Sequence, residues 1–260
     1  MTLRLVAAVR PAASVIERIP HPDAETFFKA YWETSTPVIF TDIVPSWPAF
    51  KDKRWSLDAL RERFGTVEVD ACTGRDGAPH PDENWEAHRV TLSLGEYIDR
   101  VVAAGTTNDL YLIANNRNTA RRELRALWDD VKLPPGWFST SRLAHGSALW
   151  VGPAGTVTPL HHDTSNILFC QVVGRKRIAL AAPWDPVFAA QTRGLYSGLS
   201  WEAARDRASL VELDLAPGEA LFIPVGWWHA LEALDPSVSL AVNAFSRHNS
   251  FPWYVPGAVR

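Results

Sequence analysis

Residues 158–163 read T-P-L-H-H-D, and this hexapeptide carries the clearest chemical signal in the chain. In a β-strand, residues two apart point to the same face. His161 and Asp163 are therefore expected to project together, whereas His162 points away, either as a surface residue or as a neighbour of the site. One imidazole and one carboxylate at this spacing can occupy adjacent positions on a metal ion. A third ligand must then come from another part of the chain.

His229 is the best candidate for that third ligand. It follows an apolar run at residues 221–224 and the bulky sequence G-W-W at residues 226–228, as expected of a residue at the rim of a barrel. Two histidines and one carboxylate on one face of a metal leave positions open for a co-substrate and dioxygen, which suits non-haem iron(II). Zinc accepts the same ligands but usually closes to four-coordination, and the spacing alone also allows a structural role for His161. The remaining histidines lie among polar or turn residues and are expected at the surface: His21, His80, His88, His145 and His248.

Short apolar segments separated by turn residues surround these motifs from about Tyr111 onward. Many strands at close spacing predict a sandwich or barrel rather than an alternating βαβ fold. The expected strands are residues 148–152, 166–173, 177–180, 210–215, 220–224 and 238–245.

The first third of the chain has a different pattern, with apolar residues at helical spacing. Helices are predicted at residues 23–33, 56–64 and 94–102, with a buried strand at residues 37–40. Residues 73–84 are rich in glycine, proline and charge and are expected to form an exposed loop. We predict one domain over residues 1–260, mainly β, with a helix-rich cover at 1–110 and a β core at 111–250.

The composition is that of an ordinary globular protein, with 260 residues of which 47% are hydrophobic and 21% charged. The formal net charge is −3 and the basic clusters are short, so nucleic acid is not an expected partner. The two cysteines, Cys72 and Cys170, cannot form a disulfide framework. No apolar run is long enough for a membrane span or a secretory signal, and a cytoplasmic protein without a membrane partner is expected.

Three groups of motifs carry a family resemblance. The first is W-V-G-P-A-G-T-V-T-P-L-H-H-D-T-S-N-I-L-F-C-Q-V-V-G-R-K-R-I-A-L at residues 150–180, and the second is P-G-E-A-L-F-I-P-V-G-W-W-H-A at residues 217–230. The third is the N-terminal series T-P-V-I at 36–39, W-P-A at 47–49 and W-S-L at 55–57. Together they resemble the JmjC-type, cupin-like hydroxylases. The resemblance implies a double-stranded β-helix (jelly-roll) core with helices around it, and the use of iron(II), 2-oxoglutarate and dioxygen.

The resemblance also implies roles for individual residues. His161, Asp163 and His229 match the iron ligands. Lys176 matches a lysine that pairs with the distal carboxylate of 2-oxoglutarate. Four further residues match the co-substrate pocket or are expected to shape it: Thr158 and Tyr111 as hydroxyl donors, Asn243 as an amide at the co-substrate end, and Trp150 as part of the wall.

The chemistry of a buried dicarboxylate supports these roles independently, because a buried anion needs a countercharge and hydrogen bonds. Other roles stay open on the sequence alone. Lys176 can be a solvated strand charge, Tyr111 a core residue and Asn243 an amide that caps a sheet edge. Ile167 stands where most relatives carry an asparagine near the co-substrate, and Asn166 comes one position earlier.

The resemblance implies hydroxylation of an amino-acid side chain in a protein or peptide. Lysine demethylation is less expected, because the chain is short, near neutral, and has neither a reader module nor a zinc motif. One alternative is hydroxylation of a free amino acid or other metabolite. The others are a non-catalytic metal-binding cupin-like protein and a cupin-type metal-dependent isomerase or dioxygenase; neither of these needs a buried lysine facing a co-substrate, so Lys176 discriminates the 2-oxoglutarate oxygenase from them. Residues 73–84 and 191–207 are expected to form a lid.

Overall fold

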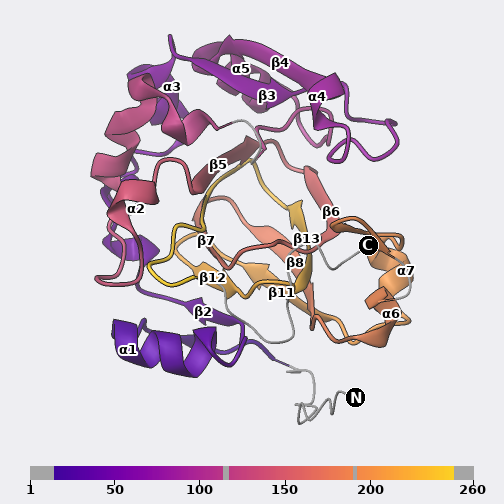
Figure 1. Cartoon of the computed structure of the whole chain (residues 1–260). Helices are drawn as coiled ribbons and strands as arrows, with labels where there is room; N and C mark the ends of the chain where they lie inside the picture. Colours follow the sequence, from indigo (N-terminus) through magenta and orange to yellow (C-terminus); the bar gives the residue numbers. More distant parts are fainter. Residues whose placement is uncertain (1–14, 114–116, 190–191, 249–260) are drawn as a thin grey trace, which may run out of the picture.

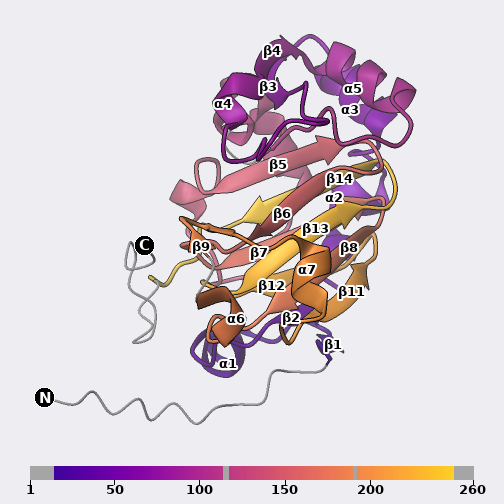
Figure 2. The same cartoon turned by 90° about the vertical axis from the view of Figure 1, so that its right-hand side faces the viewer.

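Two six-stranded β-sheets face each other in the computed structural model, which describes residues 15–113, 117–189 and 192–248 (Figures 1 and 2). The first sheet has the spatial order β1 (Arg18–Ile19), β2 (Val38–Phe40), β12 (Ala220–Ile223), β7 (Ile167–Val173), β14 (Ser237–Val242) and β5 (Ser147–Gly152). The second has the order β11 (Val211–Leu215), β8 (Lys176–Ala181), β13 (Trp228–Ala233), β6 (Val157–His161), β10 (Tyr196–Ser197) and β9 (Thr192–Arg193). Apart from the parallel β1–β2 pair the strands run antiparallel, which gives the predicted jelly-roll-like core.

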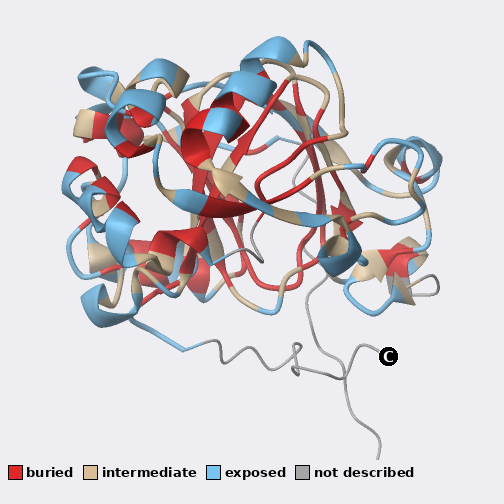
Figure 3. Cartoon of the chain, turned by 90° about the horizontal axis from the view of Figure 1, so that it is seen from above, coloured by how far each residue is buried: buried red, intermediate tan, exposed pale blue. Residues whose placement is uncertain are grey.

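Strands of the first sheet are apolar on both faces, because both faces are covered. On β7, Phe169 belongs to the cluster between the sheets, while Leu168 and Cys170 belong to the cluster on the outer side. On β12, Leu221 points inward and Phe222 outward in the same way. The alternation follows from the two-residue period of a strand. In the ribbon coloured by burial, the buried residues gather on the central strands and many exposed residues lie on the surrounding helices and loops (Figure 3).

The outer face of the first sheet is covered by the N-terminal helices α1 (Ala24–Phe27) and α2 (Pro48–Lys51) (Figure 1). Aromatic rings fill this interface, with Phe27 stacked on Trp137 at a centroid distance of 3.7 Å. The outer face of the second sheet is covered by α6 (Pro186–Ala189) and α7 (Trp201–Arg205), whose Phe188 and Ala204 pack on Trp228.

A smaller layer extends the fold beyond β5 (Figure 2). It contains the hairpin of β3 (Glu68–Cys72) and β4 (Arg89–Ser93) with helices α3 (Leu57–Phe64), α4 (Trp85–His88) and α5 (Leu94–Ala103). Single backbone bridges join it to the core, from Cys72 to Tyr111 and from Leu112 to Val151. The Tyr97 hydroxyl adds a buried hydrogen bond of 2.6 Å to the Val151 carbonyl.

The predicted fold class and all six predicted core strands are confirmed, with shifts at their ends. The helix predicted at residues 23–33 is instead a short α-helix followed by a π-helical turn, Phe28–Trp32, and this wider turn accompanies the burial of Phe27, Phe28 and Trp32 together. The strand predicted at 37–40 is β2, which pairs with β12, so the N-terminal third contributes to the core sheet as well as to its cover. The β3–β4 hairpin was not predicted.

Candidate metal centre

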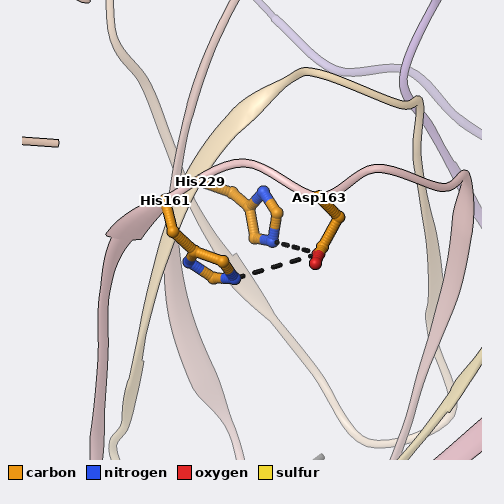
Figure 4. A group of neighbouring side chains, drawn as sticks. All are labelled: His161, Asp163 and His229. Carbon is orange, nitrogen blue, oxygen red and sulfur yellow. Dashed lines mark ion pairs between the residues drawn. The ribbon is translucent and has the colours of Figure 1, made fainter. Parts of the chain in front are cut away.

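His161, Asp163 and His229 converge at one end of the space between the sheets (Figure 4). One side-chain donor atom from each lies within 4.8 Å of the others. The Nε2 atoms of His229 and His161 lie 3.3 Å and 3.8 Å from the same Asp163 oxygen. Among the described residues, this is the group of histidine, cysteine and acidic side chains whose spacing fits a metal ion.

Strand pairing explains why two histidines far apart in the sequence meet here. β6 and β13 are antiparallel neighbours, and His161 lies directly opposite His229. β6 ends at His161, so Asp163 is held by the turn that follows rather than by the strand itself. Two ligands from paired strands and one from the next turn give a site that the sheet preorganises.

A β-bulge in β6 changes which residues face the site. His229 pairs with His161, but Leu231 pairs with Thr158, so one extra residue lies between Thr158 and His161. Pro159, which has no N–H to give to a ladder, occupies this irregular segment. Thr158 and His161 are three apart and would point to opposite faces of a regular strand, yet both line the same cavity.

The two imidazoles are oriented by backbone carbonyls. His161 Nδ1 lies 2.8 Å from the Pro159 carbonyl oxygen, and His229 Nδ1 lies 2.8 Å from that of Trp227. A carbonyl only accepts hydrogen bonds, so in each ring Nδ1 is the donor and Nε2 keeps its lone pair. Both lone pairs face Asp163, which is the arrangement that metal-binding histidines use.

Electrostatics keep these groups ready for a cation. Burial and the neighbouring His229 lower the pKa of His161 to about 4, so its imidazole is neutral at ordinary pH. Burial alone would raise the pKa of Asp163, but its contact with the His229 ring and the other adjacent imidazoles outweigh that effect and lower it. A neutral imidazole and an ionised carboxylate are the ligand forms that bind a divalent metal.

His162 points away from the centre, as predicted, but it is buried rather than on the surface. Its side chain is packed edge-on against Trp228 at 4.7 Å, and neither ring nitrogen has a hydrogen-bond partner among the residues that the structure describes. Burial lowers its pKa. Of the five histidines predicted at the surface, His88 is half-buried and the other four are exposed.

A cavity of about 190 Å³ extends from the three residues into the space between the sheets. The predicted pocket residues Tyr111, Thr158, Trp150 and Asn243 all line it, and Ile113 and Ile167 contribute apolar wall. The cavity is therefore one site, with the candidate metal ligands and the predicted co-substrate residues on a common surface.

Lys176 lies behind the Tyr111 side of this cavity. Its ammonium donates a hydrogen bond of 2.7 Å to the Tyr111 hydroxyl and lies over the rings of Tyr111 and Phe169, at 5.2 Å and 5.4 Å from their centroids. The residue is 1% exposed, and no carboxylate of the described chain forms an ion pair with it. A solvated strand charge is thus ruled out, and a buried cation without an acidic partner calls for an anion.

Further polar groups face the same end of the cavity. The Trp150 indole N–H is buried and has no hydrogen-bond partner within the described residues. Thr158 is 5% exposed. Because Lys176 donates to the Tyr111 oxygen, the Tyr111 proton remains available to a ligand. Hydrogen-bond donors of this kind, together with the buried Lys176 ammonium, suit a carboxylate ligand.

The asparagines occupy different positions. Asn243 is exposed and lines the cavity, and its amide donates to the Ser165 hydroxyl at 3.4 Å. Asn166 is 1% exposed and accepts a hydrogen bond of 2.8 Å from the Val225 N–H, which fixes the turn before β13.

Sequence comparison adds independent evidence to this geometry. A family model described as "Cupin-like domain" matches residues 24–250. The chain belongs to the cupin-like domain family. Family membership and the His161–Asp163–His229 group confirm the expectation of iron(II) and 2-oxoglutarate as cofactors.

Three relatives illustrate where this cupin-like chain is similar. It is 29% identical over 245 residues to the Danio rerio protein named "Lysine-specific demethylase 8", with 87% of this chain and 57% of that protein covered. It is 30% identical over 261 residues to "Lysine-specific demethylase JMJ30" of Arabidopsis thaliana, covering 91% and 57%. It is 26% identical over 245 residues to "Jumonji C domain-containing protein 5" of Drosophila melanogaster, covering 87% and 59%. The matched regions thus span less than two thirds of these relatives.

Several cavity residues of this cupin-like domain were not predicted. Asp82 comes from the loop at 73–84, and its carboxylate is held by the fully buried Arg75 at 3.1 Å. Arg75 also donates to the carbonyls of Asn108 and Val157, at 3.1 Å each, so it joins the loop to β6. Leu195 and Tyr196 enter from the β9–β10 hairpin. Both predicted lid segments thus border the cavity, and Arg193 links them through a contact of 2.9 Å with Glu83.

None of the helices in the described parts of the chain is long and apolar enough to cross a membrane.

Proposed function

We propose that this protein is an iron(II)- and 2-oxoglutarate-dependent oxygenase that hydroxylates an amino-acid side chain in a protein or peptide. The observation that carries the proposal is the buried Lys176–Tyr111 pair, in which Lys176 has no ion pair with a carboxylate of the described residues. The pair lies at one end of a cavity whose other end holds His161, Asp163 and His229. A metal-binding protein without a co-substrate has no need for the lysine. The pairing of a metal centre with an anion pocket accounts for both ends.

In this proposal, His161, Asp163 and His229 hold iron through two Nε2 atoms and a carboxylate. Lys176, Tyr111, Thr158 and Trp150 hold the distal carboxylate of 2-oxoglutarate by charge and hydrogen bonds. The bound iron and co-substrate supply the activation of dioxygen, and the protein supplies binding, orientation and exclusion of water. Apolar walls such as Ile167 and Phe169 keep the reacting centre dry.

The substrate class rests on the relatives and on the rim of the cavity. Two relatives are named lysine-specific demethylases, and removal of an N-methyl group begins with hydroxylation of its C–H bond. The rim carries the 40%-exposed Leu195 and the carboxylate of Asp82. An amino-acid side chain that enters past an apolar residue toward a carboxylate suits this opening.

The first test is binding and uncoupled turnover. The protein is purified anaerobically and loaded with iron(II), and then 2-oxoglutarate binding and its slow conversion to succinate are measured. We expect wild type to bind and convert 2-oxoglutarate, His161→Ala to lose metal and turnover, and Lys176→Ala to keep the metal while binding the co-substrate weakly. Binding of iron without any binding of 2-oxoglutarate would contradict the proposal and favour a metal-binding cupin-like protein.

A second step tests the substrate class. Once uncoupled turnover is established, a peptide library and a set of free amino acids are compared for stimulation of succinate formation and for gain of one oxygen atom. Stimulation by peptides supports side-chain hydroxylation in a protein, whereas stimulation by free amino acids or metabolites alone would replace that part of the proposal.

A further inference from the structure

The ring of Tyr196 stacks on one of the candidate metal ligands, His161. Strand β10 pairs with β6 so that Tyr196 is directly opposite His161. The two rings are stacked, with centroids 5.7 Å apart and planes inclined by 28°. The side chain lines the cavity together with His161, Asp163 and His229. The phenol ring is therefore next to a ligand ring and open to the same enclosed space.

Other aromatic side chains of the cavity gather at its opposite end. Tyr111 and Phe169 have Lys176 over their rings, and Trp150 lies 5.4 Å from Tyr111. A dicarboxylate bound by Lys176 would cover these three rings. Among the described residues that line the cavity, Tyr196 is the aromatic side chain that stacks on a candidate metal ligand. It does not belong to the group of rings near Lys176.

Tyr196 also lies where an incoming substrate has to pass. Its neighbour Leu195 is 40% exposed and lines the cavity, so the β9–β10 hairpin forms part of the entrance. The backbone carbonyl of Leu195 accepts a hydrogen bond of 2.9 Å from the His162 N–H, which fixes the hairpin beside the ligand strand. No hydrogen bond to the Tyr196 hydroxyl is formed by the described residues. Without a substrate in the entrance, the phenol is an electron-rich ring stacked beside the candidate metal centre.

We propose that Tyr196 is a site of oxidative self-modification, at which the enzyme hydroxylates its own phenol to a catechol when no other substrate fills the cavity. This inference rests on the proposed function. The ring C–H bond next to the hydroxyl-bearing carbon breaks and a C–O bond forms. One oxygen atom of dioxygen enters the ring and the other enters succinate, while 2-oxoglutarate loses carbon dioxide. Tyrosine and 2-oxoglutarate each give up two electrons, which together reduce one dioxygen.

Mass spectrometry of the protein itself tests the proposal. Anaerobic protein with iron(II) and 2-oxoglutarate is exposed to ¹⁸O-labelled dioxygen without any other substrate, while succinate is measured in parallel, and then it is digested. We expect the peptide containing Tyr196 to gain one labelled oxygen atom and the peptides containing Tyr31, Tyr97 and Tyr111 to gain none. The intact protein should also develop visible absorption once excess dioxygen has oxidised the iron(II), because a catechol binds ferric iron.

Two variants sharpen the result. Tyr196→Phe should lose the absorption band of a ferric catecholate, because a single oxygen added to phenylalanine gives a phenol and not a catechol. Tyr31→Phe, at a tyrosine remote from the cavity, should keep both the absorption and the label at Tyr196. Succinate formed with the label on another residue, or with no label on the protein, would overturn the proposal and leave the proposed function standing. Absence of succinate would overturn both.

Discussion

Lys176 donates its hydrogen bond to a tyrosine hydroxyl rather than to a carboxylate, although its side chain is buried. The Nζ–OH distance to Tyr111 is 2.7 Å. A phenol solvates an ammonium but does not neutralise it, so the pair keeps a positive charge inside the protein. Such a charge is costly unless an anion is bound, which makes the pair a test of the co-substrate pocket.

Replacing Lys176 by methionine keeps the length of the side chain and removes the charge. We expect the affinity for 2-oxoglutarate to fall by about 30-fold or more, because loss of one partner from a buried charge pair costs roughly 2–5 kcal/mol. Iron(II) affinity should not change, since Lys176 is not among the candidate metal ligands. Titration calorimetry with each ligand in turn measures both. Lys29→Met, at an exposed lysine, is the control, and an unchanged affinity in Lys176→Met would remove the lysine from the pocket.

The unpartnered indole N–H of Trp150 predicts a second effect on the co-substrate. Trp150→Phe keeps an aromatic ring beside Tyr111 but removes the donor. A hydrogen bond to a charged group contributes about 1.5–3 kcal/mol, so we expect 2-oxoglutarate to bind roughly tenfold or more weakly. The thermal midpoint of the ligand-free protein should not fall through loss of the donor, because that N–H has no partner to lose.

A matched control is Trp201→Phe, because the Trp201 indole is bonded to Glu212 on the outside of the second sheet. It should leave the affinity for 2-oxoglutarate unchanged. If Trp150→Phe also leaves it unchanged, the orphan N–H faces a cavity water and not the co-substrate.

Neighbouring histidines 161 and 162 should behave in opposite ways toward metal. A divalent ion at about 100 times its Kd stabilises a folded protein by roughly 2.7 kcal/mol, which raises the thermal midpoint by about 5–10 °C in a chain of this size. We expect this shift in wild type and in His162→Leu, and its loss in His161→Ala. Differential scanning calorimetry with and without iron(II), under anaerobic conditions, measures it.

The variants of His161 and His162 also distinguish a metal ligand from a buried histidine that does not bind metal. Because neither ring nitrogen of His162 has a hydrogen-bond partner in the described parts of the chain, an apolar replacement should leave the metal-free stability equal or raise it by about 1–2 kcal/mol. A loss of the metal shift in His162→Leu would mean that this histidine, rather than its neighbour, binds the ion.

The candidate ligand trio was predicted from the spacing of His161 and Asp163 together with the family resemblance, because spacing alone left a structural role for His161 open. Thr158 could be assigned only through the family resemblance. By the two-residue period of a strand, Thr158 and His161 face opposite sides, and the bulge at Pro159 that aligns them is a property of the pairing with β13. Bulges of this kind depend on two strands that are far apart in the sequence, so a single strand does not reveal them.

The residues that were missed come from a loop and a short hairpin. Asp82 and Tyr196 line the cavity, and Arg75 holds the Asp82 carboxylate in place, through conformations that no periodicity encodes. Arg75 is a clear example: it lies in a stretch rich in glycine, proline and charge, which favours solvent exposure, yet its guanidinium is fully buried by acceptors from three segments. Burial of a charged residue depends on partners that only the folded chain brings together.

Acid sensitivity of the fold should include a contribution from Asp70 on β3. Asp70 is 5% exposed. Its carboxylate accepts hydrogen bonds from Thr91 at 2.6 Å and from Arg89 and Arg121 at 2.9 Å each. Burial alone would raise the pKa of Asp70, but the bonds from Thr91 and the two arginines outweigh it and lower the pKa below its ordinary 3.8. Since the unfolded chain binds this proton more readily, the stabilisation is present above pH 3.8 and is lost as the pH falls through the lower, folded-state value.

Asp70→Asn removes the charge and keeps the shape. We expect it to lower the free energy of unfolding by about 2 kcal/mol at neutral pH, and we expect this difference to shrink steadily as the pH is lowered below 3.8. Urea unfolding of both proteins across that range measures the difference directly. Asp58→Asn, at an exposed position on α3, should stay within about 0.5 kcal/mol of wild type throughout. An Asp70→Asn cost that is the same in acid as at neutral pH would assign the stabilisation to packing, because only an ionised carboxylate can lose its contribution by protonation.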